Sequence, residues 1–271
     1  MDALAIVACR NEELQVKRCL NHLISIGFDV ILLDHESSDG SREIASELLG
    51  AGLLTIETLR WEGVFSLQKQ LETKQKIIQK YNHKWIGHFD MDEMPFPHPQ
   101  FSSLREGIKI ADQAGYSVIN FNELVFLPPP RDSSKGLAVP HHALTYYFFE
   151  PNYPRLQRIW RRSVNANNIG SGGHRLNNIG KSQIFPFDFI LRHNIVLDED
   201  HAIQKYLTRS FSSKDLANGW HGNRIKITEK SLRDYFRGHS DSAGKLKMLS
   251  HYHSVDYDLS APQQTHFWEW S

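Results

Sequence analysis

The sequence predicts an α/β fold in which helices flank a mostly parallel central sheet. Short apolar runs alternate with segments of helical periodicity over the first 90 residues. Polar side chains follow several of the apolar runs, and no internal repeat or low-complexity linker divides the chain. Alternating strands and helices are typical of parallel sheets, which collect ligands at the carboxyl ends of their strands. We therefore expect one compact domain with a ligand site at that edge of the sheet.

The four apolar runs that we predict as strands are short and end in polar or turn-forming residues. They are 4–9, 29–33, 53–58 and 84–89. Three helices are predicted between them, at 14–24, 41–49 and 66–81. In the first helix apolar side chains cluster on one face until Gly27 ends it, and in the third Leu67, Leu71, Lys74 and Ile78 recur every three or four residues.

The second half of the chain has a different texture. We predict one or two strands over 116–127, an irregular excursion or lid over 128–145, and a strand over 184–192. A helix is expected to begin near Asp198-Glu199-Asp200, because acidic residues suit the positive end of a helix dipole. Residues 1–223 are predicted as the main domain, and 224–271 as a C-terminal extension with helical and irregular parts.

The composition excludes several classes of protein. Lysine plus arginine and aspartate plus glutamate both count 31, so a chain-wide basic field for nucleic acid is absent and no nucleic-acid partner is expected. No apolar run approaches the ~20 residues that span a bilayer, which leaves only peripheral membrane association open. The start of the chain has the pattern of a strand rather than of a signal peptide. Cys9 and Cys19 are too few for a disulfide framework and suit a reducing compartment, so we expect a cytoplasmic location.

The pair Asp90 and Asp92 carries the strongest chemical signal. The two carboxylates stand two residues apart at the end of a predicted strand, where both can reach one divalent cation. Hard oxygen ligands suit Mg²⁺ or Mn²⁺, which would also hold a substrate diphosphate. The alternative is a solvated turn rich in aspartate. Other polar residues that end predicted strands favour the site, namely Arg10-Asn11-Glu12, Asp34 and Asp39.

Three segments resemble, in order and in approximate spacing, successive blocks of the family 2 glycosyltransferases that have a GT-A fold. They are IVACRNE at 6–12, VILLDHESSDGS at 30–41 and WIGHFDMDEM at 85–94. The resemblance covers residues 4–127 well and is thin beyond them. It implies a nucleotide-sugar-binding half at 1–127 and an acceptor half at 128–223.

The resemblance also implies a role for each matching position. The end of the first strand would line the base and ribose pocket, with Ala8, Arg10, Asn11 and Glu12. Asp34 and Asp39 match acidic positions of the block that holds the nucleoside, whereas His35-Glu36 depart from it and leave the base open. Lys74 would face the nucleotide, or is a solvated helix residue. Asp90 and Asp92 would hold Mn²⁺ or Mg²⁺, and Asp92 would thereby act in catalysis.

A late histidine closes the metal site in many such enzymes. His193 is our first candidate for this ligand, and His174 in a glycine-rich loop is the second and could also line the acceptor site. The pair His251 and His253 is an outside candidate. Each of these histidines could instead be structural or merely exposed.

The general base is not where the family usually places it. Residues 151–187 contain no Asp or Glu but carry Arg155, Arg158, Arg161, Arg162, Arg175 and Lys181. The arginines could clamp a diphosphate or an anionic acceptor, or line a solvated face. A base elsewhere (Glu123 or Asp188), a histidine base such as His174, and a retaining mechanism all stay open.

The resemblance and the aspartate pair together predict a metal-dependent glycosyltransferase. It would move a sugar from a nucleotide-sugar to a carbohydrate or other hydroxyl acceptor, in surface polysaccharide or glycoconjugate synthesis. One alternative is a non-catalytic nucleotide-sugar or carbohydrate-binding module on the same fold. Another is a nucleotidyltransferase, although Arg10-Asn11-Glu12-Glu13 offers no glycine-rich phosphate loop.

Overall fold

The chain folds into two compact units, as seen in a computed structural model that describes residues 1–130, 144–151 and 156–270. The first unit comprises Met1–Phe121 and Pro154–Leu191, and the second comprises Asn122–Tyr153 and Arg192–Ser271. The domain boundary predicted after residue 223 does not coincide with any boundary between these two units, and it stays a prediction. Most of the predicted excursion at 128–145, and Arg155, lie outside the described residues.

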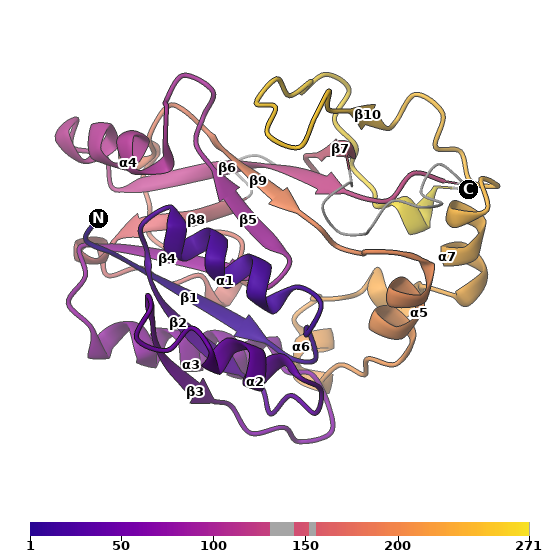
Figure 1. Ribbon diagram of the computed structural model, residues 1–271, viewed down its shortest axis with the longest axis horizontal. Helices are drawn as coiled ribbons and strands as arrows, with labels where there is room; N and C mark the ends of the chain where they lie inside the picture. The colour runs from indigo at the N-terminus through magenta and orange to yellow at the C-terminus, as the bar shows by residue number, and fades with distance from the viewer. Residues whose placement is uncertain (131–143, 152–155, 271) are drawn as a thin grey trace. The chain divides into compact units, whose positions relative to one another are not determined.

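Four parallel strands form the centre of the first unit (Figure 1), in the order β3 (Leu53–Thr58), β2 (Asp29–Asp34), β1 (Ala3–Cys9) and β4 (Trp85–Asp90). Antiparallel neighbours continue from β4, first β8 (Leu156–Arg161) and then the beginning of β6 (Val118–Phe126). The predicted parallel α/β core is thereby confirmed. Ala8 of β1 pairs with Asp90 and Cys9 pairs with Asp34, so the polar segments after β1, β2 and β4 leave the sheet at the same edge.

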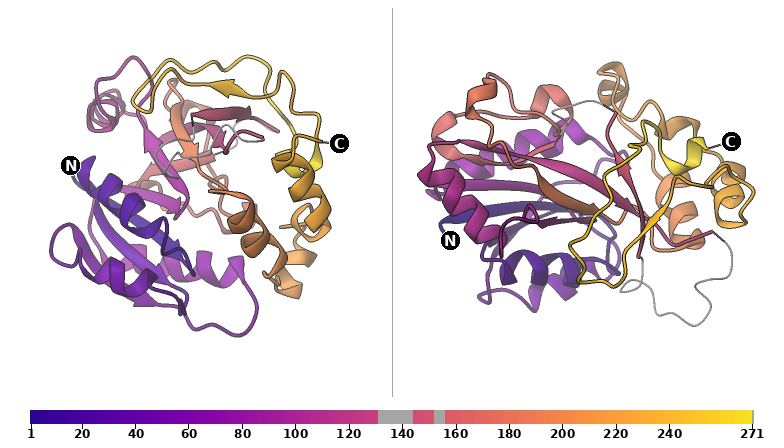
Figure 2. Two further views of the ribbon diagram at one scale, coloured as in Figure 1. Left: turned by 45° about the vertical axis from the view of Figure 1, so that its right-hand side comes forward. Right: turned by 90° about the horizontal axis from the view of Figure 1, so that it is seen from above.

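Helices cover both faces of this sheet because its strands are apolar on both sides. Alternate residues of β1, such as Ala5 and Val7, pack with α1 (Val16–Ser25), α2 (Ser41–Ser46) and α4 (Leu104–Gln113). The residues between them, Leu4 and Ile6, pack with α3 (Leu67–Lys80) on the opposite face. Figure 2 shows these layers from two further directions.

Local sequence determines where several helices begin. Ser66 and Ser103 cap α3 and α4, since each hydroxyl accepts a hydrogen bond from a backbone amide three residues later. Asp198 caps α5 (Glu199–Leu207) in the same way, and acidic residues fill the first turn as predicted. The predicted helix at 66–81 thus matches α3 to within a residue at each end, and the one expected near 198 matches α5.

The second unit is built around aromatic side chains. Its strands are β10 (Lys247–Met248), β7 (Thr145–Phe149) and the second part of β6 from Asn122 onward. Its helices are α5, α6 (Ser213–Ala217) and α7 (Glu229–Phe236), and its core includes Tyr147, Phe149, Tyr235, Phe267, Trp268 and Trp270. The extension predicted as helical at its start contains α7 and continues irregularly.

The remaining elements are short. β5 (Glu93–Phe96) pairs with β9 (Phe189–His193), which begins five residues later than the predicted strand. The 3₁₀ turns are Arg162–Val164, Ile169–Ser171, Lys181–Gln183, Arg224–Lys226 and Phe267–Glu269. Among the helices described, none is long and apolar enough to cross a membrane.

Candidate functional site

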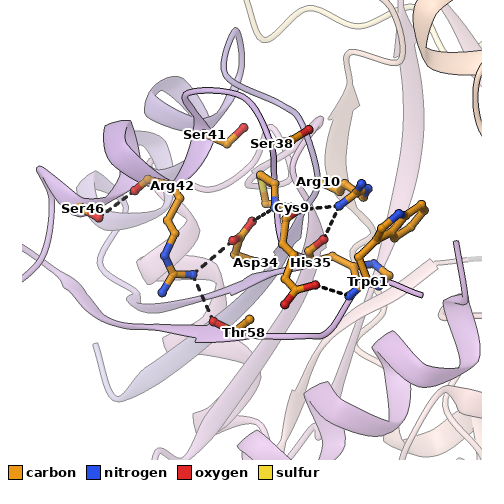
Figure 3. A network of polar contacts seen from close by, with 12 residues as sticks. Cys9, Arg10, Asp34, His35, Ser38, Ser41, Arg42, Ser46, Thr58 and Trp61 are labelled. Atoms are coloured by element: carbon orange, nitrogen blue, oxygen red, sulfur yellow. Dashed lines mark hydrogen bonds and ion pairs between the residues drawn. The ribbon is translucent and has the colours of Figure 1, made fainter. Parts of the chain in front are cut away.

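Arg10 holds together the segments that follow three of the parallel strands. Its Nη1 donates hydrogen bonds of 2.6 Å to the carbonyls of His35 and Glu36, directly after β2. Its guanidinium carbon lies 3.6 Å from the centre of the Trp61 ring, beyond the end of β3. Figure 3 shows the guanidinium beside this ring. The arginine therefore fixes the shape of the edge where a nucleoside was predicted to bind.

Asn11 joins the same two loops through its backbone and side chain. Its φ of 53° is a left-handed conformation that asparagine tolerates well. The Asn11 amide donates to Ser37 Oγ at 3.0 Å, and its Oδ1 accepts from the Ser38 amide at 2.8 Å. The Glu12 amide donates to Ser41 Oγ at 2.7 Å. Asn11 and Glu12 thus build the edge of the site, and their contact with a nucleoside stays a prediction.

The two aspartates of the second block also hold the loop after β2. Asp34 is 1% exposed, and its Oδ1 accepts from the Ser37 amide at 3.1 Å. Its Oδ2 lies 3.2 Å from Arg42 Nη1, which also contacts Thr58 (Figure 3). Asp39 Oδ2 accepts from the Glu13 amide at 3.1 Å. Both oxygens of Asp34 are therefore used to hold the loop after β2. Ala8, which was predicted to line the same pocket, is buried in β1 between β2 and β4.

His35 is a buried, neutral imidazole beside Trp61. Burial and the charge of Arg10 lower the pKa of His35 below its ordinary value. The ring packs edge-on against Trp61 with centroids 5.0 Å apart. Its Nδ1 has no hydrogen-bond partner among the described residues. The position at which the sequence departs from the family pattern is thus part of the packed edge.

Lys74 and Asp90 form a charged pair at the end of β4. Lys74 is 2% exposed and donates to the Phe89 carbonyl at 3.1 Å, and its Nζ lies 3.5 Å from Asp90 Oδ1. Burial lowers the pKa of Lys74 to about 8, although the Asp90 charge acts in the opposite direction. Burial acts to raise the pKa of Asp90, but Lys74 and Arg158 lower it overall, so this carboxylate is ionised. Lys74 is a buried partner of the aspartate pair rather than a solvated helix residue.

A fully buried ion pair lies next to Asp90. Glu93 Oε2 accepts from the Asp90 amide at 3.0 Å, and Glu93 Oε1 pairs with Arg158 Nη2. Arg158 Nη1 donates to the Gly173 carbonyl at 2.7 Å. Glu93 is 1% and Arg158 is 3% exposed. Arg158 was predicted either to clamp an anionic ligand or to lie on a solvated face. The second interpretation is wrong for this arginine, because its side chain is buried.

His88 completes the buried polar cluster. Asn168 Nδ2 lies 2.7 Å from His88 Nδ1 and 3.0 Å from the Gly173 carbonyl. Burial and the charges of Lys74 and Arg158 hold the pKa of His88 well below its ordinary value, so the imidazole is neutral. Sequence reasoning singled out neither His88 nor Asn168. The first lies within the strand-like WIGHF run, but the second carries no local signal.

The other candidates have different settings. Asp92 is 9% exposed, and His174 is exposed in the turn after Gly173. Asp188 is half-buried ahead of β9, and His251 and His253 are exposed in the second unit.

The candidate base Glu123 and the candidate metal ligand His193 contact each other. His193 Nδ1 lies 2.5 Å from Glu123 Oε1, and Glu123 is 3% exposed. Both belong to the second unit, whereas Asp90 and Asp92 belong to the first. Within the described residues, no group of three or more His, Cys, Asp or Glu side chains is placed to hold a metal ion. The predicted set of Asp90, Asp92 and His193 is thus distributed over both units and stays a prediction.

The comparison with protein families matches the part of the chain that carries the parallel strands. Residues 4–119 match the family model described as Glycosyl transferase family 2. Over these residues the chain is similar to glycosyl transferase family 2. The matched segment contains both aspartates of the pair and Lys74, whereas Glu123, Arg158, His174 and His193 lie beyond it.

Solved structures with some likeness to this protein share little sequence with it. TarS of S. aureus is 14% identical, with a TM-score of 0.41, over 90% of this chain and 44% of that chain. TarS 1–349 in complex with UDP-GlcNAc is 13% identical, with a TM-score of 0.42, over 87% of this chain and 70% of that chain. Glucosyl-3-phosphoglycerate synthase from Mycobacterium tuberculosis, in complex with Mn²⁺, UDP-glucose and phosphoglyceric acid, is 14% identical, with a TM-score of 0.29, over 45% and 43%. The chain thus spans less than half the length of the first of these. No curated protein sequence matches the chain.

The residues at the end of β4 suit a divalent cation. Asp90 is ionised and its side chain is 46% exposed, while Asp92 follows two residues later. Mg²⁺ typically takes one or two carboxylates and completes its octahedron with water and substrate phosphates. Two protein carboxylates therefore fit the donor set that such an ion takes.

Proposed function

We propose that this protein is a metal-dependent glycosyltransferase that moves a sugar from a nucleotide-sugar to a hydroxyl acceptor. The observation that carries the proposal is an ionised Asp90, paired with Asp92, at the strand end of a family 2 domain. The positive charges of Lys74 and Arg158 keep Asp90 ionised at neutral pH. An acceptor of the carbohydrate class and a place in surface polysaccharide or glycoconjugate synthesis belong to the same proposal.

Asp90 and Asp92 would hold Mn²⁺ or Mg²⁺. When bound, such an ion neutralises the negative charge that develops on a departing nucleoside diphosphate. The loops fixed by Arg10, Asn11 and Asp39 would seat the nucleoside. Their rigidity supports this role, because a site that is already ordered loses little conformational entropy when the ligand binds.

The acceptor hydroxyl needs a group that takes its proton, and two candidates stay open. Glu123 is a buried carboxylate in contact with His193, and this contact would orient the imidazole. His174 is an exposed imidazole on the loop held by Arg158 and Asn168. A cytoplasmic location is also part of the proposal, since Cys9 and Cys19 are free thiols and suit a reducing compartment.

The test begins with the donor. A panel of nucleotide-sugars with Mn²⁺ is screened by thermal unfolding, and the right donor at 100-fold excess over its dissociation constant should add about 2.7 kcal/mol of stability. Transfer and donor hydrolysis are then measured for Asp92→Asn, with Asp241→Asn as the control because Asp241 is exposed and pairs with Lys245.

We expect Asp92→Asn to remain folded and its transfer rate to fall by at least about 100-fold. Mutating a residue that only hydrogen-bonds to a metal ligand already lowers metal affinity or activity by about 10- to 100-fold. Asp241→Asn should behave like the wild type. Full activity of Asp92→Asn with Mn²⁺ would remove the metal role. A wild-type protein that binds the donor but leaves it intact would favour the non-catalytic binding module instead.

A further inference from the structure

Arg158 contacts two separate segments of the first unit from a buried position on β8. One side of its guanidinium pairs with the Glu93 carboxylate, and the other donates to the Gly173 carbonyl at 2.7 Å. The fork of an arginine can donate in two fixed directions at once, which a lysine cannot do. Arg158 is therefore a rigid link between β5 and the loop that ends at His174.

Glu93 connects Arg158 to the aspartate pair through its second carboxylate oxygen. The oxygen that does not face Arg158 accepts the backbone amide of Asp90 at 3.0 Å. Met91 and Asp92 form the turn between Asp90, the last residue of β4, and Glu93, the first of β5, so the bond closes this turn across its base. The direction in which the Asp90 peptide is held therefore depends on the carboxylate that Arg158 holds in place.

The Gly173 side of the link is equally constrained. The Gly173 carbonyl accepts from both Arg158 and Asn168, and its φ of +90° is a conformation that favours glycine. The Gln157 amide donates to the His174 carbonyl at 2.8 Å, directly beside Arg158 on the strand. The carbonyls of Gly173 and His174 are thus both attached to β8.

We infer that Arg158 is a positioning residue that sets the Asp90–Asp92 turn and the His174 loop in one fixed arrangement. The inference rests on the proposed function, because it concerns how the metal-binding and acceptor sides of that site are held at a fixed position relative to each other. A buried ion pair gives little net stability compared with apolar residues of similar size. Loss of the Glu93–Arg158 pair should therefore change the arrangement of these two segments more than the stability of the fold.

The test uses Arg158→Lys in the full chain, with Arg161→Lys as the matched control. Arg161 lies on the same strand and pairs with Asp112, away from the aspartate turn. A second variant, Glu93→Gln with Arg158→Gln, removes both buried charges and covers the case in which an unpaired charge unfolds the protein. Amide hydrogen exchange is measured at Asp90 and over 172–174, and Mn²⁺ binding is measured by electron paramagnetic resonance with the metal alone.

We expect exchange at both places to be at least about 10-fold faster in Arg158→Lys and in the double variant, while Arg161→Lys matches the wild type. The Mn²⁺ dissociation constant should rise about 10-fold, as for other residues that orient metal ligands. Unchanged exchange at either segment would overturn the inference. So would faster exchange with unchanged Mn²⁺ affinity. A wild-type protein that binds no Mn²⁺ would count against the metal in the proposed function, and the exchange data would still decide the positioning role.

Discussion

Replacing Lys74 by methionine should remove a pH-dependent part of the stability of the protein. Burial lowers the pKa of Lys74 from 10.5 to about 8 in the folded state. Between these two pH values the unfolded chain keeps a proton that the folded protein has lost, so the free energy of unfolding rises with pH. One pH unit corresponds to about 1.36 kcal/mol, and the full interval is therefore worth about 3 kcal/mol.

The quantity to measure is the difference in unfolding free energy between the wild type and Lys74→Met, by urea denaturation from pH 7 to pH 10.5. Below pH 8 the wild type has to bury a charged ammonium, and above it the neutral amine is buried at lower cost. As the pH rises across this range, we expect the unfolding free energy of the wild type to increase by about 3 kcal/mol relative to that of Lys74→Met. Lys76→Met is the control, because Lys76 is exposed on the same helix and its variant should follow the wild type. A difference that stays flat, or that falls as the pH rises, would refute the burial of a charged lysine beside Asp90.

Two further predictions concern the late histidines and the loop before His174. His193→Ala should weaken the Mn²⁺ dependence of donor hydrolysis more than His174→Ala does, since Glu123 holds the His193 ring through Nδ1 as is usual for metal-ligating histidines. The reverse ranking, measured in Mn²⁺ titrations of both variants, would assign the ligand to His174. Gly173→Ala should lower the free energy of unfolding by about 1–3 kcal/mol, because its φ is +90° and a Cβ would lie 3.4 Å from Leu71. Gly170→Ala, whose Cβ would meet nothing within 4 Å, should cost less. Equal losses in urea denaturation would show that Gly173 is not strained.

The parallel core and its ligand edge could be predicted because both depend on local patterns. Strands such as Ala3–Cys9 are continuous apolar runs, and α1 and α3 repeat their apolar residues at helical spacing. Once these strands are parallel neighbours, their carboxyl ends meet, and Arg10, Asp34 and Asp90 come to one edge without further information.

The ion pairs behind the edge could not be predicted, since they join residues far apart in the chain. Glu93 and Arg158 are 65 residues apart, and His88 and Asn168 are 80 apart. The five residues of β8 from Leu156 to Trp160 are all buried, so alternation of polar and apolar residues gives no clue to the side on which Arg158 lies. The strand β5 was hidden by its proline, because Glu93-Met94-Pro95-Phe96 has the composition of a loop.

The crossing of the chain between its two units has a practical consequence for anyone who dissects it. The chain changes unit after Phe121, after Tyr153 and after Leu191, so no single cut releases either half whole. A fragment that stops at the end of the family match, at residue 119, would lack β8 and leave the backbone amides and carbonyls along one side of β4 open to pairing with another molecule. Such a fragment should therefore aggregate.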